Sequence, residues 1–282
     1  MTDRHPIRYA VIGHPVAHSQ SPFIHAAFAA QTGEPVEYGR IDCGPDGFEA
    51  AVRDFAARGA GGCNITVPFK FEASRLASRC TERARLAGAA NTLRFDAEGW
   101  MADNTDGSGL LRDIELNAGW PLAGRRVLLI GAGGAGAGVL GPLLQARPRQ
   151  LVLVNRTADR ARTLAERHAD TARAAGVDFA VAAIEEPGRG FDLVVNASAS
   201  SLQAAAVPVP ASVLASDALA VDLMYGPAAQ AFLDWAARHG ARGRDGLGML
   251  VEQAAEAFFV WRGVRPDSAP VLQALRQRLA AK

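Results

Sequence analysis

A short apolar run that leads directly into a glycine-rich turn constrains the fold of this chain more than any other stretch. Val127–Ile130 has the length and composition of a strand buried on both faces, and Gly131-x-Gly133-x-x-Gly136 follows it. Apolar residues then recur at helical spacing. In such a strand–turn–helix unit the glycines permit a tight turn, a close approach to a pyrophosphate and close helix packing. The pattern predicts a dinucleotide-binding domain, and a glycine turn without a ligand is the alternative.

The residues after the second strand of this unit predict which dinucleotide binds. NAD-binding proteins usually place an acidic residue there to hold the ribose 2′-hydroxyl. Here the apolar run that ends at Val154 is followed by Arg156 and, one helical turn later, by Arg160. Two guanidiniums offer a 2′-phosphate bidentate hydrogen bonds, so we expect NADP. Asp159 lies between them and argues mildly against this, and two solvated arginines at a helix start are the alternative.

Length, charge and cysteine content exclude several classes of protein. A chain of 282 residues is long enough for two domains with separate cores. Its formal net charge of +1 gives no support to binding of nucleic acid or of a membrane surface. No apolar run approaches the roughly 20 residues of a membrane helix, and the N-terminus has no apolar signal core. Cys43, Cys63 and Cys80 lack metal-ligand or disulfide spacing, so we expect a cytoplasmic protein without a metal site.

Strands and helices alternate over the first hundred residues, which predicts a mainly parallel sheet. Ser21 followed by Pro22 predicts a helix N-cap with proline in the first turn, and Gly33 is expected to end that helix. The expected strands are 8–12, 36–41 and 63–67; the expected helices follow residues 21, 48 and 81; and a hairpin joins 89–95 to 100–102.

The remaining chain predicts a second domain and a return to the first. A helix at about 107–117 is expected to connect the two, and the second domain is expected to hold strands at 126–130, 151–154, 178–182, 192–196 and 219–223. Two apolar helical stripes follow Asp245 with no strand after them. Since they cannot extend the sheet, we expect residues 246–282 to complete a first domain of residues 1–106, with 107–245 as the nucleotide domain.

Polar residues that could carry chemistry gather where the first-domain strands end. In open α/β sheets, ligands bind at the carboxyl ends of the strands. Lys70 is the only ionisable group in the stretch from Asn64 to Lys70, and it follows the rigid Pro68. A lysine held near a carbonyl oxygen can donate a proton to it as hydride arrives, and Asp106 is the candidate that orients this lysine. A solvated lysine at the start of the next helix is the alternative.

Several stretches together resemble the shikimate dehydrogenase family, from about Tyr9 to the final helix. They are Ala17–Pro22, Asn64–Lys70, Ala89–Leu93, Asp103–Gly107, Asn155–Thr157 and Asp245–Leu250. The resemblance implies an α/β fold with a Rossmann-like NADP-binding domain, an α/β substrate domain with a mainly parallel sheet, and a cleft between them.

The resemblance also implies roles for individual residues. Lys70 and Asp106 would be the catalytic pair. Ser19, Ser21 and Tyr225 would hold the substrate carboxylate, and Thr66, Asn91 and Gln253 its ring hydroxyls. The nucleotide would be bound by Gly131, Ala132, Gly133, Gly134, Ala135, Asn155, Arg156, Thr157, Arg160, Leu223, Gly246 and Met249. Alternatively, Tyr225 is only a packed aromatic residue and Gln253 lies on a solvated helix face.

The function implied is the reversible NADPH-dependent reduction of 3-dehydroshikimate to shikimate in aromatic amino acid biosynthesis, by a monomer or a homodimer. A quinate/shikimate dehydrogenase using NAD and a weakly catalytic regulatory paralogue are the alternatives. Two stretches depart from the family pattern. Gly136-Ala137 replaces a more frequent Ser-Arg, and the stretch from Asn196 to Gln203 lacks a usual glycine.

Overall fold

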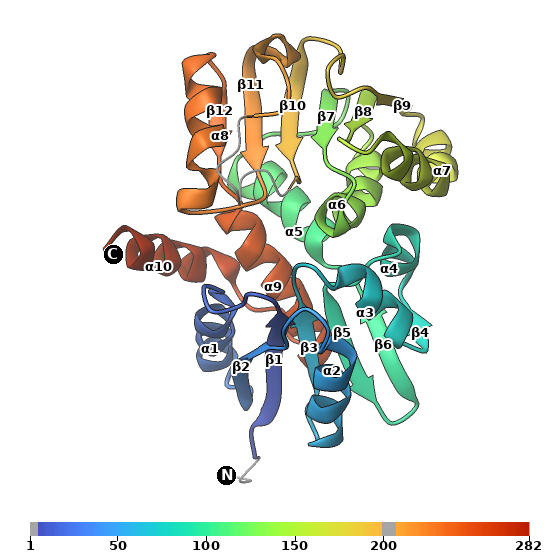
Figure 1. Cartoon of the computed structure of the whole chain (residues 1–282). Helices are drawn as coiled ribbons and strands as arrows, with labels where there is room; N and C mark the ends of the chain where they lie inside the picture. The colour runs from blue at the N-terminus through green and yellow to red at the C-terminus, as the bar shows by residue number, and fades with distance from the viewer. Residues whose placement is uncertain (1–4, 199–206, 282) are drawn as a thin grey trace. The chain divides into compact units, whose positions relative to one another are not determined.

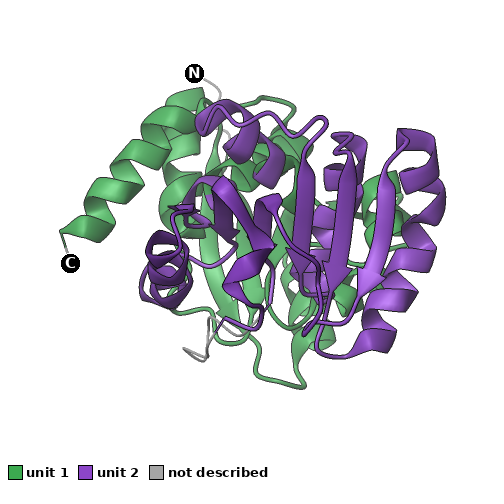
Figure 2. Cartoon of the chain, turned by 90° about the horizontal axis from the view of Figure 1, so that it is seen from above, with its two compact units in different colours: residues 1–109, 251–282 green, residues 110–250 purple. Residues whose placement is uncertain are grey.

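The chain forms two compact α/β units in a computed structural model that describes residues 5–198 and 207–281. Unit 1 comprises residues 1–109 and 251–282, and unit 2 comprises residues 110–250 (Figure 1, Figure 2). The boundaries fall inside two helices, α5 (Asp106–Arg112) and α9 (Leu247–Arg262). Among the described helices, none combines the length and apolar character needed to cross a membrane.

Unit 1 is built on a six-stranded sheet in the order β2-β1-β3-β5-β6-β4. Its further elements are β1 (Ile7–Gly13), α1 (Ser21–Thr32), β2 (Val36–Asp42), α2 (Phe48–Ala57), β3 (Gly62–Ile65), α3 (Lys70–Leu76), β4 (Arg79–Cys80), α4 (Glu82–Ala87), β5 (Thr92–Asp96), β6 (Gly99–Asp103) and α10 (Ser268–Ala280). β1 is parallel to β2 and β3, whereas β5 and β6 form an antiparallel hairpin.

The strand register of unit 1 brings several chain segments to one edge of its sheet. Ile12, near the end of β1, lies opposite Ile65 at the end of β3. Thr92, the first residue of β5, lies opposite Asn64 on one side and opposite Asp103, the last residue of β6, on the other. The segments that follow β1, β3 and β6 and that precede β5 therefore meet at this edge.

Both faces of the unit 1 sheet are covered by apolar side chains. Phe48 and Val52 of α2 share a buried cluster with Ile12. Tyr9, three residues earlier and therefore on the other face, stacks on Trp261 of α9 with ring centroids 4.5 Å apart. Burial of an aromatic side chain contributes about 1.5–3 kcal/mol, which holds α9 against β1.

Unit 2 is built on a fully parallel six-stranded sheet in the order β12-β11-β10-β7-β8-β9. Its elements are a π-helix (Asp113–Asn117), β7 (Arg126–Ile130), α6 (Gly134–Gln145), β8 (Gln150–Val154), α7 (Ala158–Ala175), β9 (Asp178–Ala182), β10 (Phe191–Asn196), a 3-10 turn (Ala211–Val213), β11 (Leu214–Asp222), α8 (Pro227–Arg238) and β12 (Arg242–Arg244). Phe232 and Trp235 of α8 pack with Leu128 and Val152, while neighbouring strand residues face the opposite side. Burial on both faces explains the continuous apolar runs.

The expected strands and helices are confirmed within a few residues, with some differences. The third strand ends at Ile65 rather than at residue 67. Ser21 is not the N-cap of α1: it is the first helical residue, and Gln20 precedes it without a side-chain cap. The hydroxyl of Ser19 instead accepts a hydrogen bond from the Ser21 amide at 3.3 Å. β4 and β12 were not predicted.

Candidate active site

Lys70 and Asp106 are in direct contact at the polar edge of the unit 1 sheet. Lys70 is the first residue of α3 and Asp106 is the first residue of α5. The Lys70 Nζ lies 2.5 Å from Asp106 Oδ2, and the two side chains are 12% and 5% exposed. Burial weakens solvent screening, so this ion pair holds the ammonium in one place far better than a surface pair would.

Asn91 binds the other oxygen of this carboxylate. Its Oδ1 accepts hydrogen bonds from the backbone amide of Thr105 at 2.8 Å and from the hydroxyl of Thr92 at 3.0 Å. The amide group is therefore turned so that its nitrogen donates to Asp106 Oδ1 at 2.9 Å. Asp106 thus receives one donor on each carboxylate oxygen, Asn91 on one and Lys70 on the other.

Gln253 joins the cluster from α9. Asn91 Nδ2 lies 3.1 Å from Gln253 Oε1, so the amide oxygen of Gln253 is the acceptor in this contact. Gln253 is only 8% exposed, so the alternative that it lies on a solvated helix face is wrong.

Further polar groups, Asn64 and Tyr38, hold the backbone of Asn91 and the hydroxyl of Thr92 in place. Asn64 Nδ2 donates to the carbonyl of Asn91 at 3.1 Å and to the hydroxyl of Thr92 at 3.0 Å. The Tyr38 hydroxyl donates to Asn64 Oδ1 at 2.7 Å. Burial raises the pKa of Tyr38, so its hydroxyl stays protonated as a donor.

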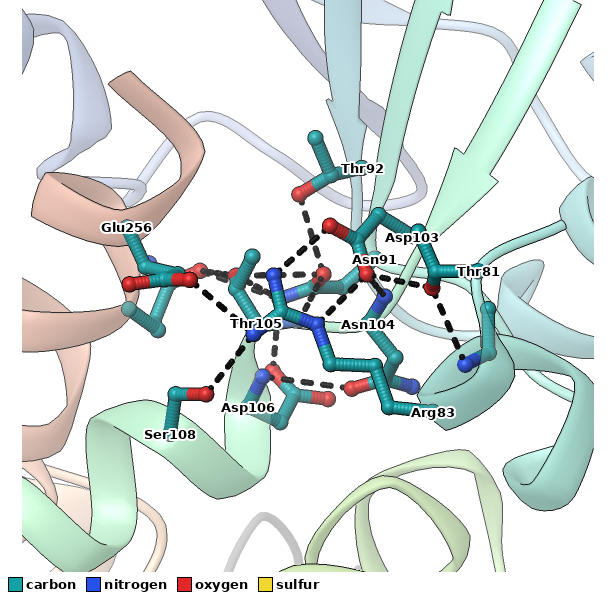
Figure 3. Close-up of polar contacts among 12 residues, drawn as sticks. Thr81, Arg83, Asn91, Thr92, Asp103, Asn104, Thr105, Asp106, Ser108 and Glu256 are labelled. Carbon is teal, nitrogen blue, oxygen red and sulfur yellow. Dashed lines mark hydrogen bonds and ion pairs between the residues drawn. The ribbon is translucent and has the colours of Figure 1, made fainter. Parts of the chain in front are cut away.

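Arg83, an arginine that no sequence pattern singled out, lies beside this cluster (Figure 3). Arg83 of α4 forms a bidentate ion pair with Asp103, with nitrogen–oxygen distances of 2.6 and 2.7 Å. It also contacts Ser108 Oγ at 2.9 Å and Glu256 Oε1 at 3.0 Å. The hydroxyl of Thr81 donates to Asp103 at 2.7 Å. Charged residues are common on helices, so nothing in a single sequence distinguishes Arg83 from a solvated arginine.

The expected carboxylate-binding serines lie together in the loop between β1 and α1. Their hydroxyl oxygens are 3.1 Å apart, and Arg40 donates from two nitrogens to the carbonyl of Ser19 at 2.6 and 3.1 Å. Thr66 follows β3 at the same edge of the sheet, where its amide donates to the carbonyl of Ile12 at 3.0 Å. The two serine hydroxyls and Thr66 are thus supplied by the segments that follow two neighbouring parallel strands.

The three glycines of the turn in unit 2 meet different surroundings. Gly131 has φ of 112°, and a Cβ there would lie 2.9 Å from the carbonyl carbon of Ala197. A Cβ on Gly136 would lie 2.0 Å from the carbonyl oxygen of Gly131. Around Gly133, by contrast, no described atom comes within 4 Å of such a Cβ. The first amides of α6, which starts at Gly134, have no acceptor within the helix. The turn is therefore tight at two glycines and open at the third.

Asn155 ties this turn to the end of β8. Its Oδ1 accepts from the amide of Ala132 at 3.0 Å, and its Nδ2 donates to the carbonyl of Thr157 at 2.8 Å. Its side chain therefore orders the turn.

Arg156 and Arg160 are exposed, and neither forms a side-chain hydrogen bond or an ion pair with another residue of the described chain. Asp159 forms its ion pair with Arg162 instead. The acidic residue that argued against a phosphate site is thus neutralised by a different arginine. Two unpaired guanidiniums remain at the end of β8, suited to an anion such as a phosphate.

Four further predicted residues belong to the end of unit 2. The backbone at Gly246 packs closely against the backbone of Leu223, because a Cβ on Gly246 would lie 2.3 Å from the carbonyl oxygen of Leu223. Met249 is buried in α9, and Tyr225 is half-buried in the segment after β11. The role expected of Tyr225 at the substrate carboxylate stays a prediction. The departure expected from Asn196 onward falls largely on residues 199–206, outside those described.

Histidines and cysteines contribute little to these clusters. His25 is fully buried and stacks on Tyr38, with ring centroids 4.1 Å apart. Cys43, Cys63 and Cys80 are free thiols. Over residues 5–198 and 207–281, no group of three or more histidine, cysteine or acidic side chains is arranged to hold a metal.

Family models match most of the chain. Residues 11–93 match the shikimate dehydrogenase substrate binding domain, residues 115–209 match shikimate / quinate 5-dehydrogenase, and residues 246–276 match the shikimate 5'-dehydrogenase C-terminal domain.

Individual relatives agree with these matches. A protein of Methylibium petroleiphilum named shikimate dehydrogenase (NADP(+)) is 65% identical over 95% of this chain and 94% of its own length. An Ael1 enzyme from Pseudomonas putida superposes with a TM-score of 0.86 at 48% identity, covering 95% of this chain and 98% of that one. A shikimate 5-dehydrogenase from Thermus thermophilus, solved with NADP(H) and shikimate, has a TM-score of 0.83 at 33% identity, with coverages of 96% and 99%.

Proposed function

Because the chain belongs to the shikimate dehydrogenase family, we propose that it catalyses the reversible NADPH-dependent reduction of 3-dehydroshikimate to shikimate. At the level of residues, the observation that carries the proposal is the buried Lys70–Asp106 contact. Residues 1–106 with 246–282 serve as the substrate domain and residues 107–245 as the NADP domain. The three free cysteines suit a reducing cytoplasm.

Lys70 moves the proton. In the direction of reduction, its ammonium donates a proton to the carbonyl oxygen that becomes the new hydroxyl, and in oxidation its neutral amine takes the proton back. Asp106 keeps the amine aimed by accepting a hydrogen bond from it. The chain supports this role in another way. Lys70 and Lys282 are its only lysines, and an arginine could not release a proton at this place.

Small hydroxyl and amide groups hold the substrate. Shikimate presents a carboxylate and ring hydroxyls, and a site built to hydrogen-bond each of them rejects analogues that lack one. Ser19, Ser21 and Tyr225 bind the carboxylate in this proposal, and Thr66, Asn91 and Gln253 bind the hydroxyls. Asn91 contacts Asp106 as well, so it links substrate binding to the proton-transfer pair.

The residues of unit 2 fit NADP. The open surroundings of Gly133, the amides at the start of α6 and the unpaired Arg156 and Arg160 match a pyrophosphate and a 2′-phosphate. The nicotinamide, when bound, supplies or accepts the hydride. Leu223, Gly246 and Met249 complete the predicted nucleotide site.

The test is the appearance of the NADPH absorbance band when the protein is mixed with shikimate and NADP+. Lys70→Ala is expected to abolish turnover, and Lys70→Arg is expected to do the same because it restores the charge without a releasable proton. Both variants should still bind shikimate measurably by calorimetry. Undiminished turnover in either variant would refute the role of Lys70.

One related activity follows from the comparison itself, since the family model matched by residues 115–209 covers quinate as well as shikimate dehydrogenases. Comparing the rate with quinate and NAD+ to the rate with shikimate and NADP+ distinguishes a quinate/shikimate dehydrogenase from a shikimate dehydrogenase. We expect NADP+ to be preferred because Arg156 and Arg160 are unpaired, and shikimate to be preferred because of the serine pair, Ser19 and Ser21. Tight binding of both ligands without any turnover would instead indicate a regulatory paralogue.

A further inference from the structure

We propose that Arg83 is a positioning residue, whose guanidinium fixes both the turn that carries Asp106 and the helix that carries Gln253. The inference rests on the proposed function, in which Asp106 orients the proton-transferring Lys70. In the described hydrogen bonds, Arg83 itself contacts none of the side chains of Lys70, Asp106 and Gln253.

The guanidinium contacts the chain on both sides of Asp106 (Figure 3). Its Nε and Nη2 bind the two oxygens of Asp103, three residues before Asp106, at 2.6 and 2.7 Å. Its Nη1 donates to the hydroxyl of Ser108, two residues after Asp106, at 2.9 Å. The segment between these contacts is thereby held at both ends by one planar group.

The same nitrogen reaches α9. Nη1 lies 3.0 Å from Glu256 Oε1, and Glu256 follows Gln253 by about one helical turn. The second carboxylate oxygen of Glu256 is paired with Arg265, so the acceptor is itself held in place. Arg83 therefore sets the turn of Asp106 and the helix of Gln253 relative to each other inside unit 1.

Only an arginine can make this set of contacts. The Asp103 side chain is 4% exposed and that of Arg83 is 28% exposed, so the carboxylate is shielded from water while the guanidinium is partly exposed. The rigid fork of a guanidinium binds two carboxylate oxygens and still presents donors to other groups, whereas an ammonium is a single point charge. A displacement of about 1 Å in an active site can reduce the rate by about a hundredfold. Loss of the fork should therefore reduce turnover even though the positive charge is kept.

The test compares Arg83→Lys with Arg94→Lys. Arg94 is a matched control, because it also forms a bidentate pair with an aspartate, Asp96, and also reaches α9, through the carbonyl of Val260 at 3.3 Å. It has no contact with the segment from 103 to 108 in the described hydrogen bonds. Both variants are assayed at a temperature at which circular dichroism shows them fully folded. Ser108→Ala removes one contact on that segment with little risk to folding.

In Arg83→Lys we expect kcat for shikimate oxidation to fall about ten- to a hundredfold, with the KM for NADP+ unchanged within about twofold. The solvent deuterium isotope effect on kcat should rise, because proton transfer by Lys70 becomes slower when Asp106 is displaced and no longer orients it. This ratio does not depend on how much of the protein is folded. Arg94→Lys should keep kcat within about twofold of the unaltered protein. The kcat of Ser108→Ala should lie between those of Arg83→Lys and Arg94→Lys.

Several results would overturn the inference. Equal kcat in Arg83→Lys and the unaltered protein would do so, as would a fall in kcat shared by Arg94→Lys or one that leaves the isotope effect unchanged. These results concern Arg83 alone, provided that the unaltered protein turns over shikimate. A complete lack of turnover in the unaltered protein would refute the proposed function, and the inference with it.

Discussion

His25 makes the stability of unit 1 depend on pH in a way that can be calculated. The imidazole lies on α1 with no exposed surface, and neither ring nitrogen has a hydrogen-bond partner among the described residues. Burial lowers the pKa of His25 from 6.5 to about 3. The folded protein therefore keeps this ring neutral at acidic pH values at which an unfolded chain would protonate it.

The sign of the effect follows from proton binding. Between pH 6.5 and about 3 the unfolded state binds more protons at His25 than the folded state does, so the free energy of unfolding falls as the pH falls. Well above pH 6.5 both states are neutral, and the contribution is constant. Each pH unit corresponds to about 1.4 kcal/mol, so at pH 4.5 the loss relative to pH 7.5 is about 3 kcal/mol.

The assay is urea denaturation at pH 7.5 and at pH 4.5, followed by far-ultraviolet circular dichroism. His25→Phe keeps an aromatic ring against Tyr38 but cannot be protonated. The variant should lose about 3 kcal/mol less than the unaltered protein over this interval, because all other titrating groups cancel in the comparison. His239→Gln, at an exposed position, is the control and should behave like the unaltered protein. Identical pH dependence in His25→Phe and the unaltered protein would refute the reasoning.

Two further predictions concern the nucleotide. Replacing both Arg156 and Arg160 by Gln should raise the KM for NADP+ by about ten- to a hundredfold and change the KM for NAD+ little, since each charged hydrogen bond is worth about 1.5–3 kcal/mol. Steady-state kinetics with both cofactors measures the two KM values. A parallel rise in the KM for NAD+ would contradict the prediction. Gly133→Ala should leave the melting temperature unchanged, because the added Cβ meets no described atom, but it should weaken NADP+ binding in calorimetry, because the pyrophosphate is expected to approach this glycine. Gly136→Ala should lower the melting temperature, because its Cβ would collide with the Gly131 carbonyl. If Gly133→Ala binds NADP+ normally, the nucleotide does not approach that glycine.

Apolar periodicity predicted most of the fold. The run before Gly131 is strand β7, and the glycine motif leads directly into α6. Two described strands that escaped prediction are short and polar: β4 has two residues, and β12 is Arg242–Arg244. Their place is set by hydrogen bonds to a neighbouring strand, which leave no apolar pattern in the sequence.

The candidate site was predictable from the residues themselves where side chains follow strand ends, whereas Gln253 of α9 was predicted by the family resemblance. Lys70 and Asp106 were expected to pair, and they do come within hydrogen-bond distance of each other. Arg83 was missed because its importance depends on which distant residues surround its guanidinium, and only the folded chain brings Asp103 and Glu256 to it. The prediction that Ser21 is the N-cap of α1 was wrong for a similar reason, since the loop that carries Ser19 determines where the helix starts.

The discontinuity of unit 1 has a consequence for biosynthesis. The stretch that forms unit 2 is continuous in the chain, whereas the polar edge of the unit 1 sheet is completed only after the residues from Val251 onward have been translated. Until then Asn91 lacks its partner Gln253, and the carbonyl of Leu93 lacks the indole of Trp261. A nascent chain that has been translated as far as Leu250 therefore holds every residue of unit 2 but still lacks Gln253 of the candidate substrate site.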